Sequence, residues 1–441
     1  MPRVYIESLG CARNQVDSEI MTGRLARSGW RTVDDPADAD AIVVNTCSFI
    51  ESAADESIDT ILALADYKTR GNCRRLIVAG CLPERYRQDI IQALPEVDVF
   101  LGTGAYDRIV DAVQGAMASG VCVLPDPDGI NLDDPAPRSV SVPHAAYLKV
   151  AEGCSRHCTF CIIPRLRGRQ KSRAMAAIVA EAEKLIAAGV KEITLVAQET
   201  TAYGSDLDGS IDLAGLMANL ATLDPSVWVR FLYGHPQTVT PKLLKTIADY
   251  PNLCPYFDIP IQHASDSVLK RMGRRYTAAD LTRLFGEIRA AIPSAALRTT
   301  VLVGFPGETD EDVRQLAQFI EQVRFDHLGV FTYSDADDLP SHALAPHVPS
   351  RIATERMDRL MDLQKGISEE KLSRFYGKTM TVLVESEAEP GIHVARSMYQ
   401  APEVDGCILV RTDRKPSAGT ILSVKVVETM EYDMIAEPNE S

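Results

Sequence analysis

The stretch Cys154-Ser-Arg-His-Cys158-Thr-Phe-Cys161 closely follows the apolar run 146–151 and places three cysteines in the order C-x-x-x-C-x-x-C. Three thiolates on one short loop can bind three irons of a 4Fe-4S cluster, because each iron takes one thiolate. The fourth iron then has no protein ligand and can bind a small molecule. The triplet therefore predicts a cluster with one open coordination position.

Two other ligand sets remain open for the triplet. A structural zinc site is less favoured, because such sites usually have four protein ligands and often a second pair of cysteines close in sequence. His157 is a candidate fourth ligand, but it lies between Cys154 and Cys158 on a tight loop.

A second set of cysteines follows the first strands of the chain. Residues 1–118 alternate short apolar runs with helical periodicity, which predicts an α/β domain with a doubly wound parallel sheet. Cys11, Cys47 and Cys81 each follow one of the first three runs. The carboxyl ends of parallel strands meet at one edge of a sheet, so these thiols should converge. We expect a second 4Fe-4S cluster there; the alternative is three buried structural cysteines.

The centre of the chain predicts a partial (βα)6 barrel. Residues 119–143 form a proline-rich linker, and residues 144–375 contain six apolar runs separated by helical patterns such as 176–188 and 310–323. In such barrels the chemistry lies at the carboxyl ends of the strands, and Cys154 comes just after the first one. The six predicted strands are 146–150, 192–196, 228–232, 256–259, 298–303 and 328–332.

Residues 376–441 consist of short alternating runs that fit a small antiparallel β-barrel of the oligonucleotide-binding kind. Residues 377–441 hold six Lys or Arg against eleven Asp or Glu. An acidic barrel matches RNA phosphates poorly and suits a basic protein partner.

The whole chain of 441 residues carries a formal charge of -15. No run approaches the length of a membrane span, and the first residues show no secretory signal pattern. We therefore expect a cytoplasmic protein whose ten cysteines are metal ligands or buried thiols and not disulfides.

Five motifs together resemble the methylthiotransferases of the radical S-adenosylmethionine (SAM) class, over essentially the whole chain. They are Ser8-Leu-Gly-Cys11 with Asn14 and Asp17-Ser-Glu19, Asn45-Thr-Cys47, Ala79-Gly-Cys81, the triplet, and Gly304-Phe-Pro-Gly-Glu308. Further features are similar to the branch that modifies ribosomal small-subunit protein twelve, namely Cys161-Ile-Ile-Pro164, Gln198 to Gly204, Ala395-Arg-Ser397, Ala401 to Gly406 and Glu431-Tyr-Asp433.

The resemblance implies a two-cluster reaction. SAM would bind the open iron at Cys154, Cys158 and Cys161 and yield a 5′-deoxyadenosyl radical, which removes a hydrogen from the β-carbon of an aspartate in the ribosomal protein. The cluster at Cys11, Cys47 and Cys81 would present a sulfur that a second SAM methylates. It implies no catalytic side chain beyond the cluster ligands, a TRAM-type barrel, a sulfur source, a one-electron donor and a monomer acting on the free protein or on the ribosome.

Several side chains are expected to contact SAM. Phe160 would lie against the adenine, Gln198 and Glu199 would bind the amino or ribose groups, and Arg298 would meet the carboxylate. A turn that follows the fifth strand would let its backbone approach the adenosyl group; it comprises Gly304, Phe305, Pro306 and Gly307. The alternatives are a core aromatic, a helix cap and a bare turn.

The arginines and lysine between Arg165 and Arg173 are expected to form a solvated face, with steering of an anionic substrate as the alternative. Two departures from the family pattern are Glu199, where close relatives usually have Asp, and the loop 334–340, where they usually have a Glu-containing segment.

Two rival functions remain. The first is methylthiolation of a modified adenosine beside the tRNA anticodon, for which a basic terminal barrel would be expected. The second is a non-catalytic iron–sulfur carrier, which would not explain a six-unit barrel with a glycine turn at its active face.

Overall fold

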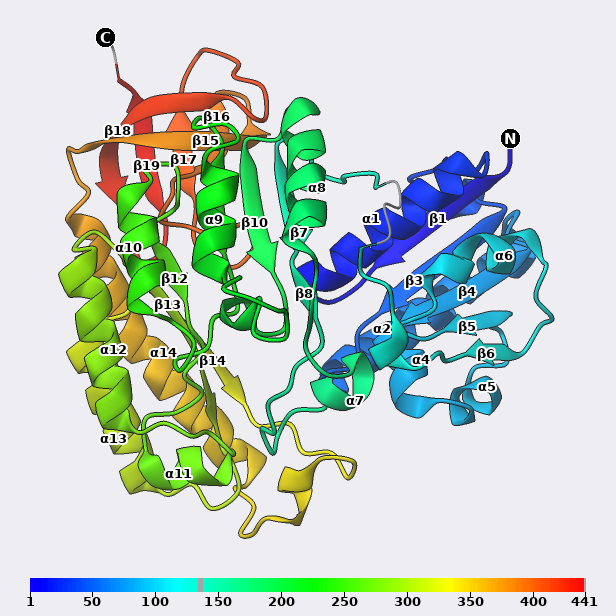
Figure 1. Cartoon of the computed structure of the whole chain (residues 1–441), viewed down its shortest axis with the longest axis horizontal. Coiled ribbons are helices and arrows are strands. Elements are labelled where there is room, and N and C mark those ends of the chain that lie inside the picture. The colour runs from blue at the N-terminus through cyan, green and yellow to red at the C-terminus, as the bar shows by residue number, and fades with distance from the viewer. Residues whose placement is uncertain (134–137, 440–441) are drawn as a thin grey trace.

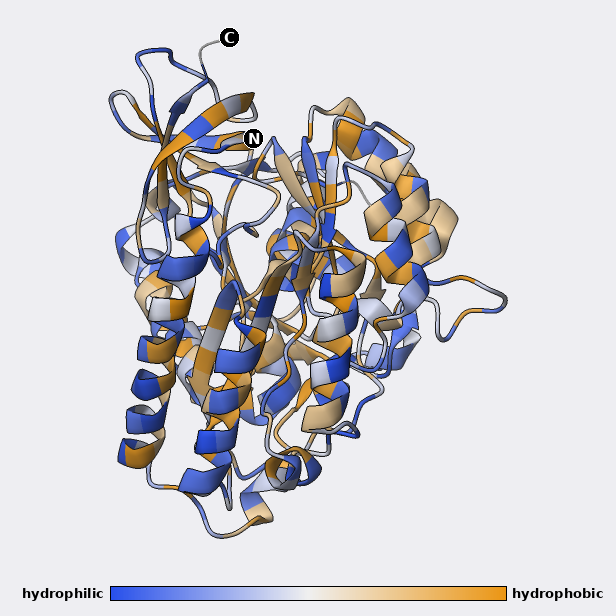
Figure 2. Ribbon diagram, turned by 90° about the vertical axis from the view of Figure 1, so that its left-hand side faces the viewer, coloured by the Kyte–Doolittle hydropathy of each residue, from blue (hydrophilic) through white to orange (hydrophobic). Residues whose placement is uncertain are grey.

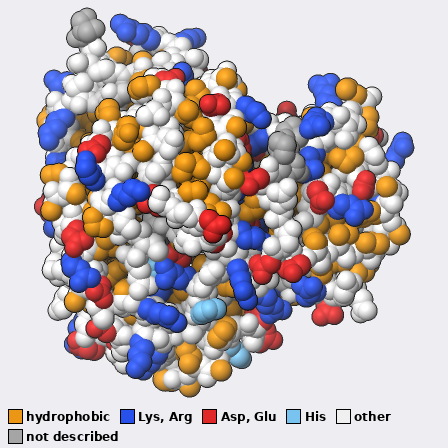
Figure 3. All heavy atoms as spheres, viewed as in Figure 1, with side chains coloured by type: hydrophobic (Ala, Val, Ile, Leu, Met, Phe, Trp, Pro, Cys, Tyr) orange, Lys and Arg blue, Asp and Glu red, His pale blue; other side chains and the backbone are white. Residues whose placement is uncertain are grey.

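The computed structural model describes residues 1–133 and 138–439. Three parts follow one another along the chain: an α/β domain, a partial barrel and a small closed barrel that packs on the partial barrel (Figure 1). A notch separates the N-terminal domain from the rest of the surface (Figure 3).

The N-terminal domain is a parallel sheet with helices on both faces, as predicted. Along β3, Ala41 and Val43 face one core and Ile42 and Val44 face the other, because successive strand residues point to opposite sides. The strand order is β2 (Arg31–Thr32), β1 (Arg3–Ser8), β3 (Ala41–Thr46), β4 (Arg75–Gly80), β5 (Val99–Leu101) and β6 (Val121–Val123). The α-helices are α1 (Ala12–Arg27), α2 (Glu51–Ala65), α3 (Tyr67–Arg70), α4 (Cys81–Tyr86), α5 (Asp89–Ala93) and α6 (Ile109–Gln114).

The first residues of the predicted linker belong to this sheet. β6 lies inside the segment 119–143 and pairs with β5 at the sheet edge. An edge position suits a strand that runs into prolines, because one side of an edge strand needs no partner. Pro135 and Pro137 of the predicted linker lie outside the described residues.

The partial barrel consists of the six predicted strands in two parallel three-stranded sheets. The two sheets adjoin between β11 and β12, where Val229 of β11 forms a bridge to Leu253, three residues before β12. The sheets have the orders β11 (Trp228–Phe231), β10 (Glu192–Val196), β7 (Ala145–Lys149) and β12 (Tyr256–Asp258), β13 (Ala296–Val303), β14 (His327–Thr332).

Amphipathic helices cover this barrel on the outside, with hydrophilic and hydrophobic residues alternating along them (Figure 2). Two of them begin with capping boxes, at Thr277 with Asp280 and at Thr309 with Asp312. The helices are α8 (Met175–Ala187), α9 (Leu213–Ala221), α10 (Pro241–Asp249), α11 (Asp266–Arg271), α12 (Ala278–Ala291), α13 (Asp310–Val323) and α14 (Ser350–Ser373).

The C-terminal barrel is closed by a strand that the sequence pattern did not reveal, β19 (Met434–Pro438). Neighbouring strands are antiparallel, as predicted, except for β17 and β19, which are parallel. The barrel order is β15 (Thr379–Glu389), β16 (Ile392–Arg396), β17 (Ile408–Arg411), β19 and β18 (Ile421–Thr429).

Within the described residues, no helix combines the length and the apolar character needed to cross a membrane.

Candidate iron–sulfur and SAM sites

The triplet lies on a loop whose two ends are fixed by regular secondary structure. It lies between β8 (Ala151–Glu152) and α7 (Ile163–Arg167), and β8 pairs with β9 (Lys171–Ser172), which follows α7. The loop also contacts the end of α11, where Thr159 N donates to Met272 O at 3.1 Å. A Cβ at Gly273 would lie 2.7 Å from the His157 oxygen, so only glycine lets these segments approach so closely.

The three triplet thiols lie close enough to influence one another. The pKa of Cys161 is raised to about 12, mainly by burial and also by the thiolates of Cys158 and Cys154. Burial also raises the pKa of Cys154, with a contribution from Cys158. Bound cations are what keep such thiols deprotonated. The His157 side chain is exposed.

The second set of cysteines converges at the carboxyl edge of the N-terminal sheet. Ser8, Asn45 and Ala79 are neighbours across three strands, and the cysteines follow within a few residues. A Cβ at Gly10 would lie 3.1 Å from Cys47 Sγ. The pKa of Cys47 is raised to about 11, mainly by burial and also by Cys81 and Cys11, so the three thiols share one small region.

Two arginines make the second set suitable for anionic sulfur ligands. Burial alone would raise the pKa of Cys11, but Arg13 and Arg167 lower it below its usual value. Arg167 Nη2 lies 3.5 Å from Cys81 Sγ. In the part of the chain that the structure describes, no three His, Cys, Asp or Glu side chains gather tightly enough for a single metal ion. Three thiols without a fourth protein ligand fit a 4Fe-4S cluster with one open iron better than a structural zinc ion, which takes four ligands.

The two cysteine sets meet across the domain interface. Cys81 packs in one apolar cluster with Ile162 and Leu166, and Ile162 directly follows the last cysteine of the triplet. Two thiol sets that lie 73 residues or more apart in sequence are thus brought to the two sides of one interface, counting from Cys81 to Cys154.

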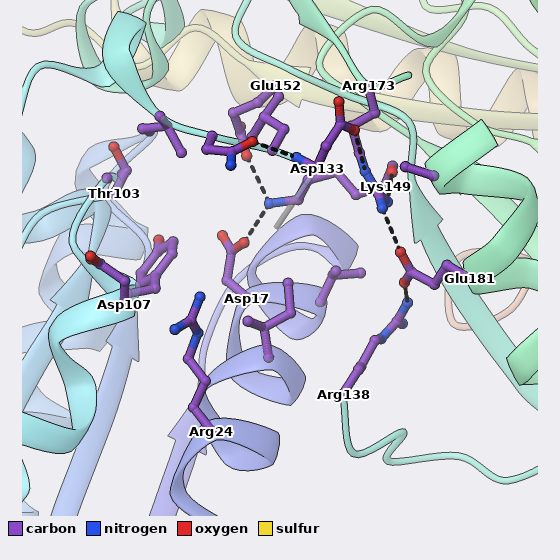
Figure 4. A pocket seen from close by; sticks show the side chains of 18 of the residues that line it. Asp17, Arg24, Thr103, Asp107, Asp133, Arg138, Lys149, Glu152, Arg173 and Glu181 are labelled. Atoms are coloured by element: carbon purple, nitrogen blue, oxygen red, sulfur yellow. Dashed lines mark hydrogen bonds and ion pairs between the residues drawn. The ribbon is translucent and has the colours of Figure 1, made fainter. Parts of the chain in front are cut away.

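A buried ion network lines the interface beside the second set. Lys149 pairs with Asp17 and, at 2.7 Å, with Glu152. These three side chains face a cavity of about 750 Å³ between the domains (Figure 4). Arg173 and Arg138 both pair with Glu181 at another side of this cavity. Arg167 and Arg173 are buried, so the expectation of a solvated basic face was wrong for them.

The glycine turn lies beside the triplet, as expected for a shared cofactor site. The rings of Phe160 and Phe305 pack edge to face with centroids 6.3 Å apart. The two glycines of this turn were expected to let the backbone approach the adenosyl group, but the structure shows that neighbouring protein atoms already lie close to both positions. A Cβ at Gly304 would lie 2.5 Å from Ala353 Cβ, and one at Gly307 would lie 1.8 Å from the Arg271 guanidinium. Protein atoms therefore occupy the space that these glycines leave free.

Gln198 and Glu199 follow β10 and both reach residues around the triplet. Gln198 donates to Glu152, and its Oε1 is buried without a partner, which leaves an acceptor for a bound ligand. Glu199 forms a bidentate pair with Arg156 of the triplet, at 2.7 and 2.8 Å. The carboxylate of Glu199 therefore holds the loop, and it caps no helix through its side chain.

Arg298 does not lie where a SAM contact was expected. It pairs with Asp258 at 2.9 Å and with Asp405, from the segment between β16 and β17, at 3.3 Å. Gly304 comes six residues later, directly after the end of the same strand, roughly 20 Å away at the usual rise of a strand. The guanidinium of Arg298 is thus paired with two carboxylates of the protein and lies away from the glycine turn.

Arg274 is a residue that the sequence analysis missed. Its guanidinium lies 5.6 Å from the ring centre of Phe160 and 6.0 Å from that of Tyr276. Burial lowers the pKa of Arg274, but Tyr276 and the thiolates of Cys158 and Cys161 raise it above its usual value. Its Nε is buried without a partner. The sequence signal was a basic pair, Arg274 and Arg275, directly after Gly273.

The loop after β14 connects the barrel to the N-terminal domain. Asp338 accepts two hydrogen bonds from Arg85, at 2.8 and 3.1 Å. Asp335 accepts from Tyr333 and contacts His342, each at 2.9 Å. The aspartates of this loop thus fix its position beside the second cysteine set.

Comparisons with known proteins agree with all three parts of the fold. Family models match at residues 3–102 (Uncharacterized protein family UPF0004), 148–320 (Radical SAM superfamily) and 377–438 (TRAM domain). Among solved structures, the radical SAM methyltransferase TsrM from Kitasatospora setae has a TM-score of 0.54 at 13% identity, over 83% of this chain and 89% of that one. The cobalamin-dependent SAM radical enzyme OxsB has a TM-score of 0.53 at 13% identity, over 83% of this chain and 56% of that one.

Curated relatives match almost the full length. The ribosomal protein uS12 methylthiotransferase RimO of Desulfosudis oleivorans is 53% identical, over 99% of both chains. The enzyme of the same name from Clostridioides difficile is 43% identical, again over 99% of both chains. At such identity over the whole length, the chain belongs to the RimO family of radical SAM methylthiotransferases.

Proposed function

We propose that this protein transfers a methylthio group to the β-carbon of an aspartate in ribosomal protein uS12. The observation that carries the proposal is the meeting of two three-cysteine sites across one interface, with Cys81 packed against Ile162. A carrier of iron–sulfur clusters has no need for two three-cysteine sites on the two sides of one interface. The full-length relatives that are named uS12 methylthiotransferases support the same reaction.

The six cysteines would hold two 4Fe-4S clusters, Cys154, Cys158 and Cys161 one of them, and Cys11, Cys47 and Cys81 the other. When bound, the first supplies one-electron cleavage of SAM and hydrogen removal, and the second supplies an iron that carries the transferred sulfur. The reaction also needs a sulfur source and a one-electron donor. We further propose that the enzyme is a cytoplasmic monomer.

The residues around the triplet would bind and orient SAM. Phe160 and Phe305 form an apolar wall beside the loop. Gln198 Oε1 is an unpaired acceptor that suits an ammonium or a hydroxyl group. Arg274 offers a cation for the SAM carboxylate, because its Nε has no partner in the protein. This assignment replaces Arg298, whose guanidinium is paired elsewhere.

The C-terminal barrel favours a protein substrate over tRNA. Residues 377–441 hold eleven acidic against six basic side chains, which repels a phosphate backbone and attracts a basic protein. The rival reaction at the modified adenosine of tRNA uses the same two cluster sites, so this charge is the feature that separates the two substrates.

The test is mass spectrometry after anaerobic incubation of the reconstituted enzyme with SAM, sulfide and a reductant. Ribosomal protein uS12 and tRNA are offered in separate reactions. We expect a methylthio mass gain on an aspartate of uS12 and none on tRNA. A gain on tRNA alone would establish the rival reaction, and SAM cleavage without any transfer to either substrate would reject both.

A further inference from the structure

Arg167 belongs to the triplet's helix but extends into the other cysteine site. It is the last residue of α7, six positions after Cys161, and its side chain is 3% exposed. Its Nη2 donates to Asn14 Oδ1 at 2.6 Å and lies 3.5 Å from Cys81 Sγ. The guanidinium of Arg167, on the helix that follows the triplet, is therefore a direct neighbour of the Cys81 thiol in the N-terminal domain.

The position of Arg167 is fixed by carboxylates from both domains. Its Nη1 donates to Asp17 of α1 at 2.9 Å and contacts Glu152 of β8 at 3.4 Å. Lys149 shares both carboxylates. The two cations and the two carboxylates thus form one buried ion network at the interface. Within it, Arg167 also contacts Cys81 Sγ.

The N-terminal domain makes a reciprocal contact with the barrel. Arg13, two residues after Cys11, donates to Ala197 O at the end of β10, at 2.9 Å. Its guanidinium also lies 4.5 Å from the ring centre of Tyr233, which follows β11. Arg13 and Arg167 thus reach across the interface in opposite directions, and Arg167 donates toward a thiol of the opposite domain.

We propose that Arg167 is a positioning residue through which the barrel tunes the cluster of the N-terminal domain. Its charged hydrogen bond to Cys81 raises the reduction potential of that cluster, because a donor to a thiolate ligand stabilises the more negative, reduced state. Since Arg167 is attached to the triplet's helix, the potential depends on the docking of the two domains. This inference rests on the proposed function, which places a cluster on Cys11, Cys47 and Cys81.

The test isolates the second cluster in the full-length chain. A parent variant with Cys154, Cys158 and Cys161 all changed to Ala keeps only the second cysteine set. After anaerobic reconstitution, its midpoint potential is measured by a redox titration followed by electron paramagnetic resonance. The parent is compared with the same chain carrying Arg167→Met, Arg167→Lys or Arg167→Gln. The matched control is Arg165→Met, on the same helix, where the side chain is 52% exposed and pairs with Asp338.

The expected order of potentials follows from charge and donor. Arg167→Met should shift the midpoint to a more negative potential, Arg167→Lys should lie between it and the parent, and Arg165→Met should match the parent. Arg167→Gln, which keeps a donor without the charge, should lie below Arg167→Lys. Unshifted potentials in loaded Lys, Gln and Met variants would overturn the proposal. If Arg167→Met does not bind iron, the Lys and Gln variants decide alone.

Failure of the proposed function would give a different result. In that case the parent itself, with Arg167 in place, would bind fewer than four irons per chain, since the second set would hold no 4Fe-4S cluster. A loaded parent whose potential is insensitive to Arg167 rejects only the role of this arginine.

Discussion

Glu199 holds Arg156 inside the cysteine triplet through two hydrogen bonds of 2.7 and 2.8 Å. The side chain of Glu199 is 6% exposed and that of Arg156 29%. This pair holds the carboxyl end of β10 against the triplet loop. The carboxylate of Glu199 therefore has a structural role in holding the triplet loop.

We expect Glu199→Gln to loosen the triplet loop. The variant keeps the size of the side chain but leaves Arg156 without its charge partner, which should lower the free energy of unfolding by about 1.5–3 kcal/mol. Reconstituted iron per chain should fall toward four, because only the triplet site is affected. Glu199→Asp, which keeps the charge, should restore most of the iron, and Glu183→Gln on the exposed side of α8 is the control. Full iron content and an unchanged unfolding midpoint in Glu199→Gln would contradict this role.

Separate loss of the two cysteine sites should separate two activities. Cys158→Ala should abolish SAM cleavage, because the triplet then lacks one of its three thiolates. Cys47→Ala should leave 5′-deoxyadenosine formation running while no methylthio product appears. Chromatography of 5′-deoxyadenosine and mass spectrometry of uS12 measure the two outcomes in one reaction. Full product from Cys47→Ala would mean that the second site does not present the sulfur.

Arg274 and Arg298 give opposite predictions for SAM affinity. Arg274→Ala should weaken SAM binding at least about tenfold, since a charged hydrogen bond to the carboxylate contributes about 1.5–3 kcal/mol. Arg298→Ala should leave the dissociation constant unchanged, because Asp258 and Asp405 already pair with that guanidinium. Calorimetry with the cluster-loaded enzyme measures both, and the exposed neighbour Arg275→Ala is the control. The reverse order of the two effects would restore Arg298 as the SAM contact.

The sequence was sufficient for features that follow strand ends. Cys11, Cys47 and Cys81 come after three parallel strands, and the regular geometry of a parallel sheet brings such positions together without knowledge of side chains. The six strands of the partial barrel were likewise confirmed, because each is a short apolar run between helical patterns. β19 escaped notice because Met434–Pro438 ends in a glutamate and a proline, which are uncommon in strands.

The sequence was not sufficient where a side chain finds its partner in a distant segment. Arg298 forms an ion pair with Asp405, which lies 107 positions later in the sequence, in the segment between β16 and β17. Arg167 was expected in a solvated face, yet Asp17 and Asn14 from the first helix surround it. Such pairings depend on how domains pack, and neither periodicity nor spacing reports that.

Glu192 should make the stability of the protein depend on pH in the acid range. It is fully buried at the start of β10, where it pairs with Arg230 and, at 2.7 Å, with Arg396 of the C-terminal barrel. Burial alone would raise the pKa of Glu192, but the two arginines lower it below its usual value. Because the pKa is lower in the folded state, this carboxylate stabilises the fold above its unfolded pKa of about 4.3. That stability is lost as the pH falls through the folded pKa.

Arg396→Met tests this linkage. Removing one partner of a buried pair should cost about 3–5 kcal/mol at pH 7, because Glu192 is left with a single cation. The pKa of Glu192 then rises toward its usual value, so the loss of stability on acidification should be shallower than in the wild type. Denaturant unfolding at pH 7 and pH 4 measures both effects. Arg411→Met, an exposed residue of the same barrel, is the control. An identical acid dependence in Arg396→Met and wild type would contradict the role of this pair.

The acidic charge of the C-terminal barrel should set the affinity for the basic substrate. Glu387 and Glu389 are exposed at the end of β15. Changing both to Lys takes the net charge of residues 377–441 from -5 to -1. Binding of uS12 should weaken about three- to tenfold at low salt, since an exposed ion pair contributes roughly 0.2–1 kcal/mol, and the difference should shrink as salt screens the charges.

The same charge change at Glu183 and Glu321, on α8 and α13, is the control and should have a smaller effect. SAM cleavage without substrate should be unchanged in both, because neither pair of residues touches a cysteine site. Equal affinity of the two double variants for uS12 would mean that the barrel attracts the substrate no more than the rest of the acidic surface does.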